Sequence, residues 1–559
     1  MRLPRPGFLS RPGYLNRPIV RRAGAIALVL GVGVALAAAS AVAGPVTPSR
    51  PVAQPLPVSP RTASVVCPGP EGLSVPEGAD PVAPGGPVTL SVAVTGAPPG
   101  TAPRGTASPA VGAAVTPLAS VAGQGQAAGP GHAAGHPGDE AVPVKASAAS
   151  AGVATVPLTQ AGAVAFTART PAGAQAPLTG GVQTTLARSG DLRSLVGAGC
   201  AAPATQNWLV GSGTGPGRRA RLLVANPAPA PATVDVHVLT PDGPVDPVNG
   251  QGVLVPAQSQ IALLVDALVP GKAAVAVRVQ AREGRVVATL QDSLLRGLVA
   301  GGVDDVVAGT GPAPVQAVPG LDVRASAVKD GPDRLPADPG DPGAVAVRVA
   351  VPGTQDAVVT VKLVGSTGAV ALPAGVANVA AGAVADFPVS GVPDGEYTAV
   401  VQADVPVVAG AVIGRAVKGS ELAGTPDGVA VDVPPAELAW AAATDPLATS
   451  LVPLPPAVPA RLIVGALGRA SVVKITPVAS SGAFGAARLL KVPAGRTVAA
   501  ALPSAAAAVL LEPLGGPVHA AIALEVADPA GPMVSVLALQ PPLSSTRRSL
   551  PVVERPRLH

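Results

Sequence analysis

The sequence predicts a mainly β protein, with several β-sandwich-like domains in tandem, disordered linkers rich in Pro, Gly and Ala, and one N-terminal transmembrane helix. Alternating valines, regularly spaced turn residues and an internal repeat support the β prediction. From Thr233 to Leu239, Val234, Val236 and Val238 alternate with polar side chains. Successive side chains of a strand point to opposite faces, so this pattern indicates a sheet with one buried and one solvated face.

The alternating runs are separated by residues that favour turns. Pro fixes φ and Gly tolerates positive φ, so clusters of these residues with Asn, Asp or Glu end a strand. Such clusters occur at Asn226-Pro227, Pro241-Asp242-Gly243, Pro270-Gly271 and Glu283-Gly284. Short strands at this spacing predict small β-sandwiches.

The alternating pattern belongs to a repeat whose clearest copy runs from Leu222 to Asp292, with weaker copies beginning near Val347 and Leu462. The starts are 125 and then 115 residues apart, which is too long for a solenoid repeat and favours separate domains. We interpret the end of each copy as a hairpin, formed by 275–279 with 284–288, 399–401 with 405–409, and 509–511 with 516–520. A turn similar to Val-Pro-Ala-Gly precedes each hairpin, at 255–257, 379–382 and 492–495.

The composition limits the stability and the partners of these domains. Hydrophobic residues make up 48% of the 559 residues but are mostly Ala and Val, and aromatic residues are 1%. Cores of small side chains bury little apolar area each, so we expect modest stability. The 67 Gly and 68 Pro residues approach the composition of disordered chains. The net charge of +5 forms no basic stripe with interleaved aromatic residues, so no nucleic-acid partner is predicted.

The N-terminal region predicts a membrane anchor. Residues 1–22 are basic without an acidic residue, and Ala23 to Ala43 is an uncharged apolar run of 21 residues. A helix of that length spans about 30 Å, one bilayer core, and basic flanking residues place its N-terminal side in the cytoplasm. A cleaved signal peptide is the alternative, because Ala41-Val42-Ala43 fits a cleavage site; a buried helix of a soluble domain is another. The Pro-rich residues 44–61 are interpreted as an extended spacer.

Cys67 and Cys200 are the two cysteines of the chain. Two cysteines in an exported protein most simply form one disulfide. A catalytic cysteine is the alternative, but the sequence supplies no matching His and Asn constellation. We therefore predict a bridge across 133 residues.

The predicted organisation follows from these features. The chain divides into a basic cytoplasmic N-terminus (1–22), a transmembrane helix (23–43), a Pro-rich spacer (44–61), a small β domain (62–205), three sandwich-like repeats (206–300, 343–416 and 436–541) and a basic tail (542–559). The small β domain has predicted strands at 88–94 and 163–167. Its Gly/Ala-rich insertion 96–152 is expected to be flexible, because such sequences bury too little apolar surface to offset ordering entropy. Residues 292–342 are a predicted linker with a short strand-like patch at 315–323, and residues 417–459 are a second predicted linker.

Two patterns could carry chemistry but have a simpler interpretation. His132 and His136 have the spacing of metal ligands on a helix, yet Gly, Ala and Pro surround them, which favours solvated loop residues. Ser326-Ala327-Val328-Lys329 and Ser471-Val472-Val473-Lys474 match the S-x-x-K motif of penicillin-binding enzymes. That chemistry needs Ser and Lys one helical turn apart, whereas the second match lies in an alternating strand and the first lacks partner motifs.

The remaining candidates also favour structural roles. Gly211 to Gly217 is interpreted as a loop, because no lysine-bearing helix follows it. His519 takes a strand position in the repeat, which favours a packed side chain over a catalytic base. Asp304 and Asp305 could bind calcium, but two carboxylates are too few ligands without further help. The aromatic residues of the exported part are expected to anchor cores: Phe166, Trp208, Phe387, Tyr397, Trp440 and Phe484.

The chain resembles an uncharacterised actinobacterial family of membrane-anchored, exported β-rich proteins, a domain of unknown function. The features that carry the resemblance are the basic N-terminus with Ala23–Ala43, Cys67-Pro68-Gly69-Pro70, Cys200 with Asn207–Gly211, Asn226-Pro227 followed by Ala232–Val238, and Gly302–Asp305. The resemblance implies an envelope location and a non-enzymatic role. The Gly/Ala-rich insertion after Gly96 departs from the family pattern.

We therefore expect a non-enzymatic, single-pass cell-membrane protein with its C-terminal bulk outside the cytoplasm and a structural or binding role. The expected partners are the cytoplasmic membrane, through residues 23–43, and an envelope protein or glycan. No catalytic, cofactor-binding or metal-binding residue and no cofactor are predicted. The alternatives are an envelope hydrolase or transpeptidase acting on peptidoglycan or glycan, and a cleaved, secreted binding protein.

Overall fold

The computed structural model describes residues 56–58, 62–70, 86–96, 111–122, 141–147, 150–159, 161–170, 177–324, 344–417, 434–542 and 548–550. The predicted cytoplasmic N-terminus 1–22 and transmembrane helix 23–43 lie outside these ranges, as do His132, His136, Ser326 and Lys329. Among the helices that these ranges contain, none has the length and apolar character needed to cross a membrane.

The chain forms two compact units. In the first, residues 1–58 and 548–559, strand β1 (Leu56–Val58) pairs antiparallel with β35 (Arg548–Leu550). Residues 548–550 of the predicted basic tail thus form a strand. The second unit, residues 59–547, holds the remaining described elements.

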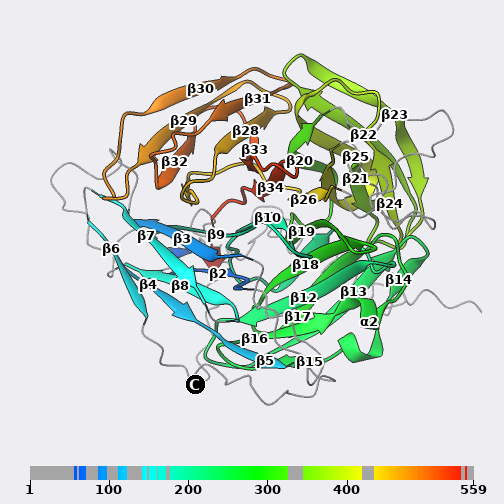
Figure 1. The fold of residues 1–559 in the computed structure, drawn as a ribbon, viewed down its shortest axis with the longest axis horizontal. Helices are drawn as coiled ribbons and strands as arrows, with labels where there is room; N and C mark the ends of the chain where they lie inside the picture. Colours follow the sequence, from blue (N-terminus) through cyan, green and yellow to red (C-terminus); the bar gives the residue numbers. More distant parts are fainter. Residues whose placement is uncertain are drawn as a thin grey trace, which may run out of the picture. The chain divides into compact units, whose positions relative to one another are not determined.

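The described part of the second unit contains four β-sandwiches, which Figure 1 shows in sequence colours from blue to red. In sandwich 1, one sheet has the order β2 (Thr62–Cys67), β8 (Val164–Arg169), β4 (Val111–Pro117) and β6 (Val142–Ala146), and the other has β10 (Ser194–Gly199), β9 (Leu178–Ala187), β3 (Val88–Thr95) and β7 (Gly152–Leu158). In sandwich 2, one sheet has β11 (Gln206–Val210), β17 (Ala276–Glu283) and β13 (Ala232–Thr240), which pairs with β14 (Gly243–Val245) and β15 (Val253–Val255). Its other sheet has β19 (Val299–Val307), β18 (Val287–Arg296), β12 (Arg218–Asn226), β16 (Ser259–Leu264) and β5 (Ala119–Ala122).

Sandwiches 3 and 4 repeat this strand order. In sandwich 3, β20 (Ala313–Val323), β25 (Gly395–Arg415), β22 (Ala357–Gly365) and β23 (Gly368–Val379) form one sheet, and β26 (Glu437–Ala442), the same β25, β21 (Val345–Ala350) and β24 (Val384–Pro388) form the other. In sandwich 4, one sheet has the order β27 (Ser450–Pro453), β32 (Ala508–Pro513), β29 (Ser471–Val478) and β30 (Arg488–Val492). The other sheet has the order β34 (Met533–Ala538), β33 (His519–Val526), β28 (Ala460–Ala466) and β31 (Arg496–Ala501). Two one-turn helices, η1 (Val248–Gly250) and α2 (Val265–Leu268), lie in sandwich 2.

The predicted alternation is confirmed where it was strongest. Val234, Val236 and Val238 of β13 are fully buried in the core of sandwich 2, between its two sheets. Sandwich 1 obeys the same order of strands, so its eight strands form a fourth copy that the sequence pattern did not show. Phe166 and Leu90, from opposite sheets, are both fully buried in its core.

The predicted hairpin at the end of each repeat is wrong. β17 pairs with β13, whereas β18 pairs with β12 in the opposite sheet, and β32 and β33 are divided in the same way. In sandwich 3 the two runs form one strand, β25, which pairs with β22 as far as Ala403 and with β21 from Val408 onward. Two alternating runs separated by a turn signal do not reveal whether they bond to each other, and here the chain crosses between sheets.

The predicted turns before these crossings are confirmed. They separate β15 from β16, β23 from β24 and β30 from β31. A residue at the end of each turn has positive φ: 50° at Gln258, directly after the predicted 255–257, 74° at Gly382 and 68° at Gly495. Glycine reaches that conformation without a steric cost, so two of the three copies use it.

Parts of the predicted flexible segments are strands. The insertion 96–152 contains β4, β5 and β6, and Val111 and Val115 of β4 are buried in the core of sandwich 1. The predicted linker 292–342 contains β19 and β20, and the linker 417–459 contains β26 and β27. β20 includes the strand-like patch predicted at 315–323, and β26 and β27 lie within the predicted third repeat, 436–541. Low sequence complexity masked β4, β5 and β6.

Two sets of strands connect the sandwiches. We call β2, β11, β20 and β27 the first strands. We call the last strand of each sandwich its central strand: β10, β19, β26 and β34. Contacts between them close a cycle, because β10 contacts β19, β19 contacts β26, β26 contacts β34 and β34 contacts β10. The four sandwiches therefore share one centre within the second unit.

Each first strand packs on the following sandwich. β11 contacts β25, β20 contacts β33 and β27 contacts β9, while Val66 of β2 clusters with Val287 of β18. Glycine permits two of these approaches. A Cβ at Gly180 would collide with the Leu451 carbonyl oxygen, and a Cβ at Gly410 with that of Val210.

Candidate functional site

The central strands place two pairs of polar side chains in the interior, which we together call the central cluster: Ser194 with Glu437, and Asp304 with Ser535. Each comes from a different central strand, and all four are buried. The Ser535 hydroxyl donates to Asp304 Oδ1 at 3.1 Å, and the Trp440 backbone N–H donates to Asp304 Oδ2 at 2.6 Å. Both Asp304 oxygens thus have a donor.

The other carboxyl, Glu437, is less well satisfied. Ser194 Oγ lies 2.5 Å from Glu437 Oε1 and 2.6 Å from the Val303 carbonyl oxygen, but a hydroxyl has one proton to donate. Both contacts are satisfied when Glu437 carries a proton and donates it to Ser194. Glu437 Oε2 has no hydrogen-bond partner within the described residues.

Burial dominates the electrostatics of this cluster. Desolvation raises the pKa of Glu437 to about 8, against the lowering effects of hydrogen bonds from Ser194 and Leu438 and of the Arg193 charge. Desolvation also raises the pKa of Asp304 well above its ordinary value, opposed mainly by the Trp440 backbone N–H. A protonated Glu437 near neutral pH agrees with the geometry at Ser194.

A second polar network joins sandwiches 2 and 3. Arg348 pairs with Asp386 through Nε at 2.8 Å and Nη2 at 2.9 Å, and its guanidinium carbon lies 5.1 Å from the Trp440 ring centre. Arg348 also donates to the carbonyl oxygen of Ser212. The Trp440 indole donates to Asp292 Oδ2 at 2.8 Å, which places this large ring within the core of sandwich 2.

The Gly-rich segment 211–217 is a loop, as predicted, and its glycines serve this packing. A Cβ at Gly211 would lie 3.0 Å from the Trp440 ring and closer still to Val306. Ser212 donates to Asp292 Oδ1 at 2.8 Å. The loop is therefore part of the joint between sandwiches 2 and 3.

A pocket of about 310 Å³ lies past the carboxyl ends of the central strands; we call it the axial pocket. The segments that follow the four central strands contribute to its lining: 200–202 after β10, 308–311 after β19, Asp445 after β26 and 539–542 after β34. The strands β2, β9 and β27 supply 63–65, 179–182 and 450–453. Its volume lies at the lower end of the range for small-ligand sites.

The lining of the axial pocket is almost uncharged. Among the described residues that line it, Asp445 is the one ionisable side chain besides the disulfide-bonded Cys200. Two of its amides are used by the fold: Asn207 bonds Val286 and Ala288, and Gln540 donates to the Ala443 carbonyl oxygen at 2.7 Å. The exposed side chains of Gln206 and Asp445 remain to meet a ligand.

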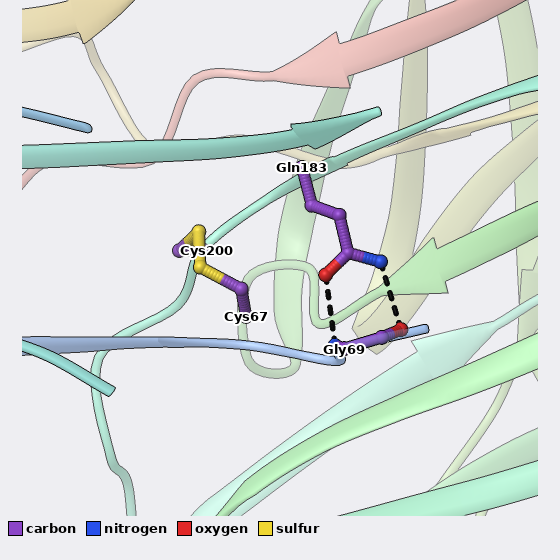
Figure 2. Close-up of a disulfide and its surroundings, with 4 residues drawn as sticks. All are labelled: Cys67, Gly69, Gln183 and Cys200. Carbon is purple, nitrogen blue, oxygen red and sulfur yellow. Dashed lines mark hydrogen bonds between the residues drawn. A yellow bond between two sulfur atoms is a disulfide. The ribbon is translucent and has the colours of Figure 1, made fainter. Parts of the chain in front are cut away.

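The predicted disulfide between Cys67 and Cys200 is confirmed. It ties the end of β2 to the residue after β10, with 4.3 Å between the Cα atoms, and Cys200 borders the axial pocket. Figure 2 shows the amide of Gln183 beside it, which accepts from the Gly69 N–H and donates to the Gly69 carbonyl oxygen, both at 2.8 Å. The start of sandwich 1 is thereby fixed to its central strand.

The other predicted candidates lie apart from the pocket. Ser471 and Lys474 lie on strand β29, and Lys474 Nζ pairs with Glu512 at 2.8 Å, as a strand interpretation requires. His519 Nδ1 lies 2.8 Å from the Thr444 carbonyl oxygen, and burial lowers the pKa of its imidazole. Asp304 belongs to the central cluster. Asp305, its neighbour on β19, is also buried.

Sequence reasoning missed Ser194, Glu437 and Ser535. Their common signal is a single polar residue in a short apolar strand that ends a sandwich, as in Ser-Leu-Val-Gly, Glu-Leu-Ala-Trp and Met-Val-Ser-Val. That signal is weak by itself, because serine and glutamate are also common on exposed strand faces.

The fold and the pocket define the class: a tandem β-sandwich protein whose domains share one polar centre and one axial pocket. The chain belongs to a family of unknown function, DUF5719, whose model matches residues 148–503. The matched region runs from β7 of sandwich 1 to β31 of sandwich 4. A search of curated proteins gave no match.

Proposed function

We propose that this chain is a non-enzymatic cell-envelope protein that residues 23–43 hold in the cytoplasmic membrane, with its sandwiches outside the cytoplasm. Its role is to bind an envelope protein or glycan partner in the axial pocket. The observation that carries the proposal is the convergence of all four sandwiches on one pocket whose lining is nearly uncharged.

The chemistry of the lining supports binding rather than catalysis. Hydrolysis or transpeptidation needs a nucleophile, a base and an orienting group within hydrogen-bonding reach. Asp445 is exposed, Cys200 is in a disulfide, and the Ser64 and Ser450 hydroxyls bond Thr167 and the Ala448 carbonyl oxygen. The disulfide and the two hydroxyls hold the fold together, and the exposed Asp445 carboxylate has no neighbouring nucleophile among these groups to activate.

Two observations support the location. The Cys67–Cys200 disulfide is typical of oxidising compartments outside the cytoplasm. The basic residues 1–22 before the apolar run 23–43 favour an inside-to-outside orientation. An actinobacterial, membrane-anchored origin is part of the same proposal.

The test is crosslinking in intact cells, with membrane and culture-medium fractions analysed separately. Gly311 lines the pocket and its Cβ position is open, so Gly311→Trp should obstruct the pocket without a clash. Gly468→Trp is the matched control, because that position is equally open but outside the pocket lining. We expect a membrane-fraction partner with wild type and the control, and its loss with Gly311→Trp.

Equal partner recovery with both variants would contradict a role for the axial pocket. Recovery of the protein in the medium alone, with an N-terminus at Gly44, would replace the anchored protein by the secreted alternative. Turnover of peptidoglycan by the purified chain would revive the enzyme alternative.

A further inference from the structure

The wall of the axial pocket includes an edge strand whose outer main-chain groups are only partly paired within the part of the chain that the structure describes. β2 is the terminal strand of its sheet, with β8 on its inner side. On the outer side, the Val66 N–H donates to the Ala201 carbonyl oxygen at 2.8 Å, and the Ala201 N–H donates back at 3.0 Å. The outer edge of β2 is thus a surface that already accepts one strand-like partner.

Strand alternation gives the direction of the neighbouring groups. Val66 bonds outward to Ala201, so the residue two positions earlier, Ser64, also directs its N–H and carbonyl oxygen outward. The close contact of Ser64 Oγ with Thr167 Oγ1, 3.0 Å, fits the non-hydrogen-bonded pair that this alternation requires between β2 and β8. Ser64 also lines the axial pocket.

Ala201 cannot extend its pairing to Ser64. The chain continues from Ala201 to Pro203, which has no N–H, and Ala204 pairs instead with Val286 of sandwich 2. Within the described residues, no backbone bond is found at the outer edge of Ser64. A donor and an acceptor are therefore available at the pocket wall, spaced as a strand spaces them.

The lining restricts what can pair there. It contains no cationic side chain among the described residues, which disfavours phosphate or carboxylate ligands, and no aromatic platform on which a sugar could stack. Small residues next to the edge, such as Ala63, Gly199 and Ala202, leave room for a backbone to approach. Main-chain amides are the groups that an unpaired strand edge recognises.

We propose that the axial pocket binds an extended, uncharged peptide segment of a partner protein, which adds to the outer edge of β2 by pairing with the main chain of Ser64. This inference rests on the proposed function and names the ligand class for the same pocket. The peptide backbone supplies the hydrogen bonds, and small side chains fit between β2 and the segment 308–311.

The experiment uses the purified full chain, a phage-displayed random octapeptide library as the probe, and two variants of Ser64. Ser64→Pro removes the outward N–H, which β8 does not use, whereas Ser64→Ala keeps it; both lose the hydroxyl contact with Thr167. We expect enrichment of uncharged peptides with wild type and Ser64→Ala, and an approximately tenfold or greater loss of affinity with Ser64→Pro.

A second measurement leaves the protein unchanged. The selected peptide is synthesised with single backbone N-methyl groups, and methylation at the one residue that pairs with Ser64 should abolish binding while methylation at either neighbouring residue should not. Enrichment of charged peptides, binding of an N-acetylglucosamine oligosaccharide in place of peptides, or equal affinity of the two Ser64 variants would overturn the proposal. If Gly311→Trp still removes the cellular partner while Ser64→Pro does not, the pocket function stands and the strand pairing fails.

Discussion

The central strands carry two regions with opposite properties. In the central cluster, Ser194, Asp304, Glu437 and Ser535 are buried and bond in two pairs across strands. In the axial pocket, Gly, Ala and Pro residues follow the same strands and leave about 310 Å³ open. The size of the side chains on the four central strands, and in the segments that follow them, therefore decides where the centre is filled by side chains and where it can receive a ligand.

The largest effect on stability is expected from Trp440, whose backbone N–H bonds Asp304 of the central cluster and whose ring packs in the core of sandwich 2. Trp440→Ala should lower the free energy of unfolding by about 3–5 kcal/mol, because it leaves a cavity and removes the partner of Asp292. Urea unfolding followed by circular dichroism measures this change. Trp440→Phe, which keeps a ring over Arg348, should cost less; an equal loss would show that ring packing is unimportant there.

The disulfide belongs to the pocket side of this comparison, because it borders the axial pocket and fixes β2 to the end of β10. The Cys67→Ala/Cys200→Ala variant should lose about 2–4 kcal/mol of unfolding free energy. Chemical denaturation of the two proteins at equal pH measures it. Labelling of both cysteines in the unfolded, unreduced wild type would contradict the bridge itself.

The central cluster should make the free energy of unfolding depend on pH, through Glu437. Its folded-state pKa of about 8 exceeds the ordinary value of 4.5, so the folded state binds more protons between these values. The stability that Glu437 contributes is therefore fully present below about pH 4.5 and is lost as the pH rises to about 8. From pH 6 to pH 8 the loss in unfolding free energy is roughly 2 kcal/mol.

Glu437→Gln should flatten that slope, apart from the share contributed by Asp304, whose pKa is also raised. Thermal or urea unfolding at pH 6, 7 and 8 measures the difference. The groups that face Glu437 are Ser194, the Leu438 and Leu195 N–H groups and the Arg193 charge. Parallel slopes for the variant and the wild type would exclude Glu437 as the source.

The smallest effect is expected outside both regions. Lys474→Ala removes a partly exposed ion pair with Glu512 and should change the unfolding free energy by about 0–1 kcal/mol. Partner capture in cells should be unchanged. A loss of capture with normal stability would mean that Ser471 and Lys474 have a role beyond the strand in which they lie.

Local pattern was a good guide to strands and a poor guide to their partners. The alternation at Val234 to Val238 predicted β13, and two cysteines in a chain expected to be exported predicted the disulfide. The same reasoning joined β17 to β18 as a hairpin, because a turn signal does not specify which sheet receives the next strand. It also left β4 within a flexible insertion, because its Ala and Val become a strand only against the rest of sandwich 1.

The sequence alone determined the β class, the turns, the disulfide and three of the four repeats, since these depend on neighbouring residues or on residue type. Tertiary structure decided the crossings between sheets, the shared centre and the axial pocket. Ser194 and Glu437 are 243 residues apart, and Asp304 and Ser535 are 231 residues apart. Contacts of that range leave no periodic signal in one chain, because only the closed cycle of sandwiches brings the four strands together.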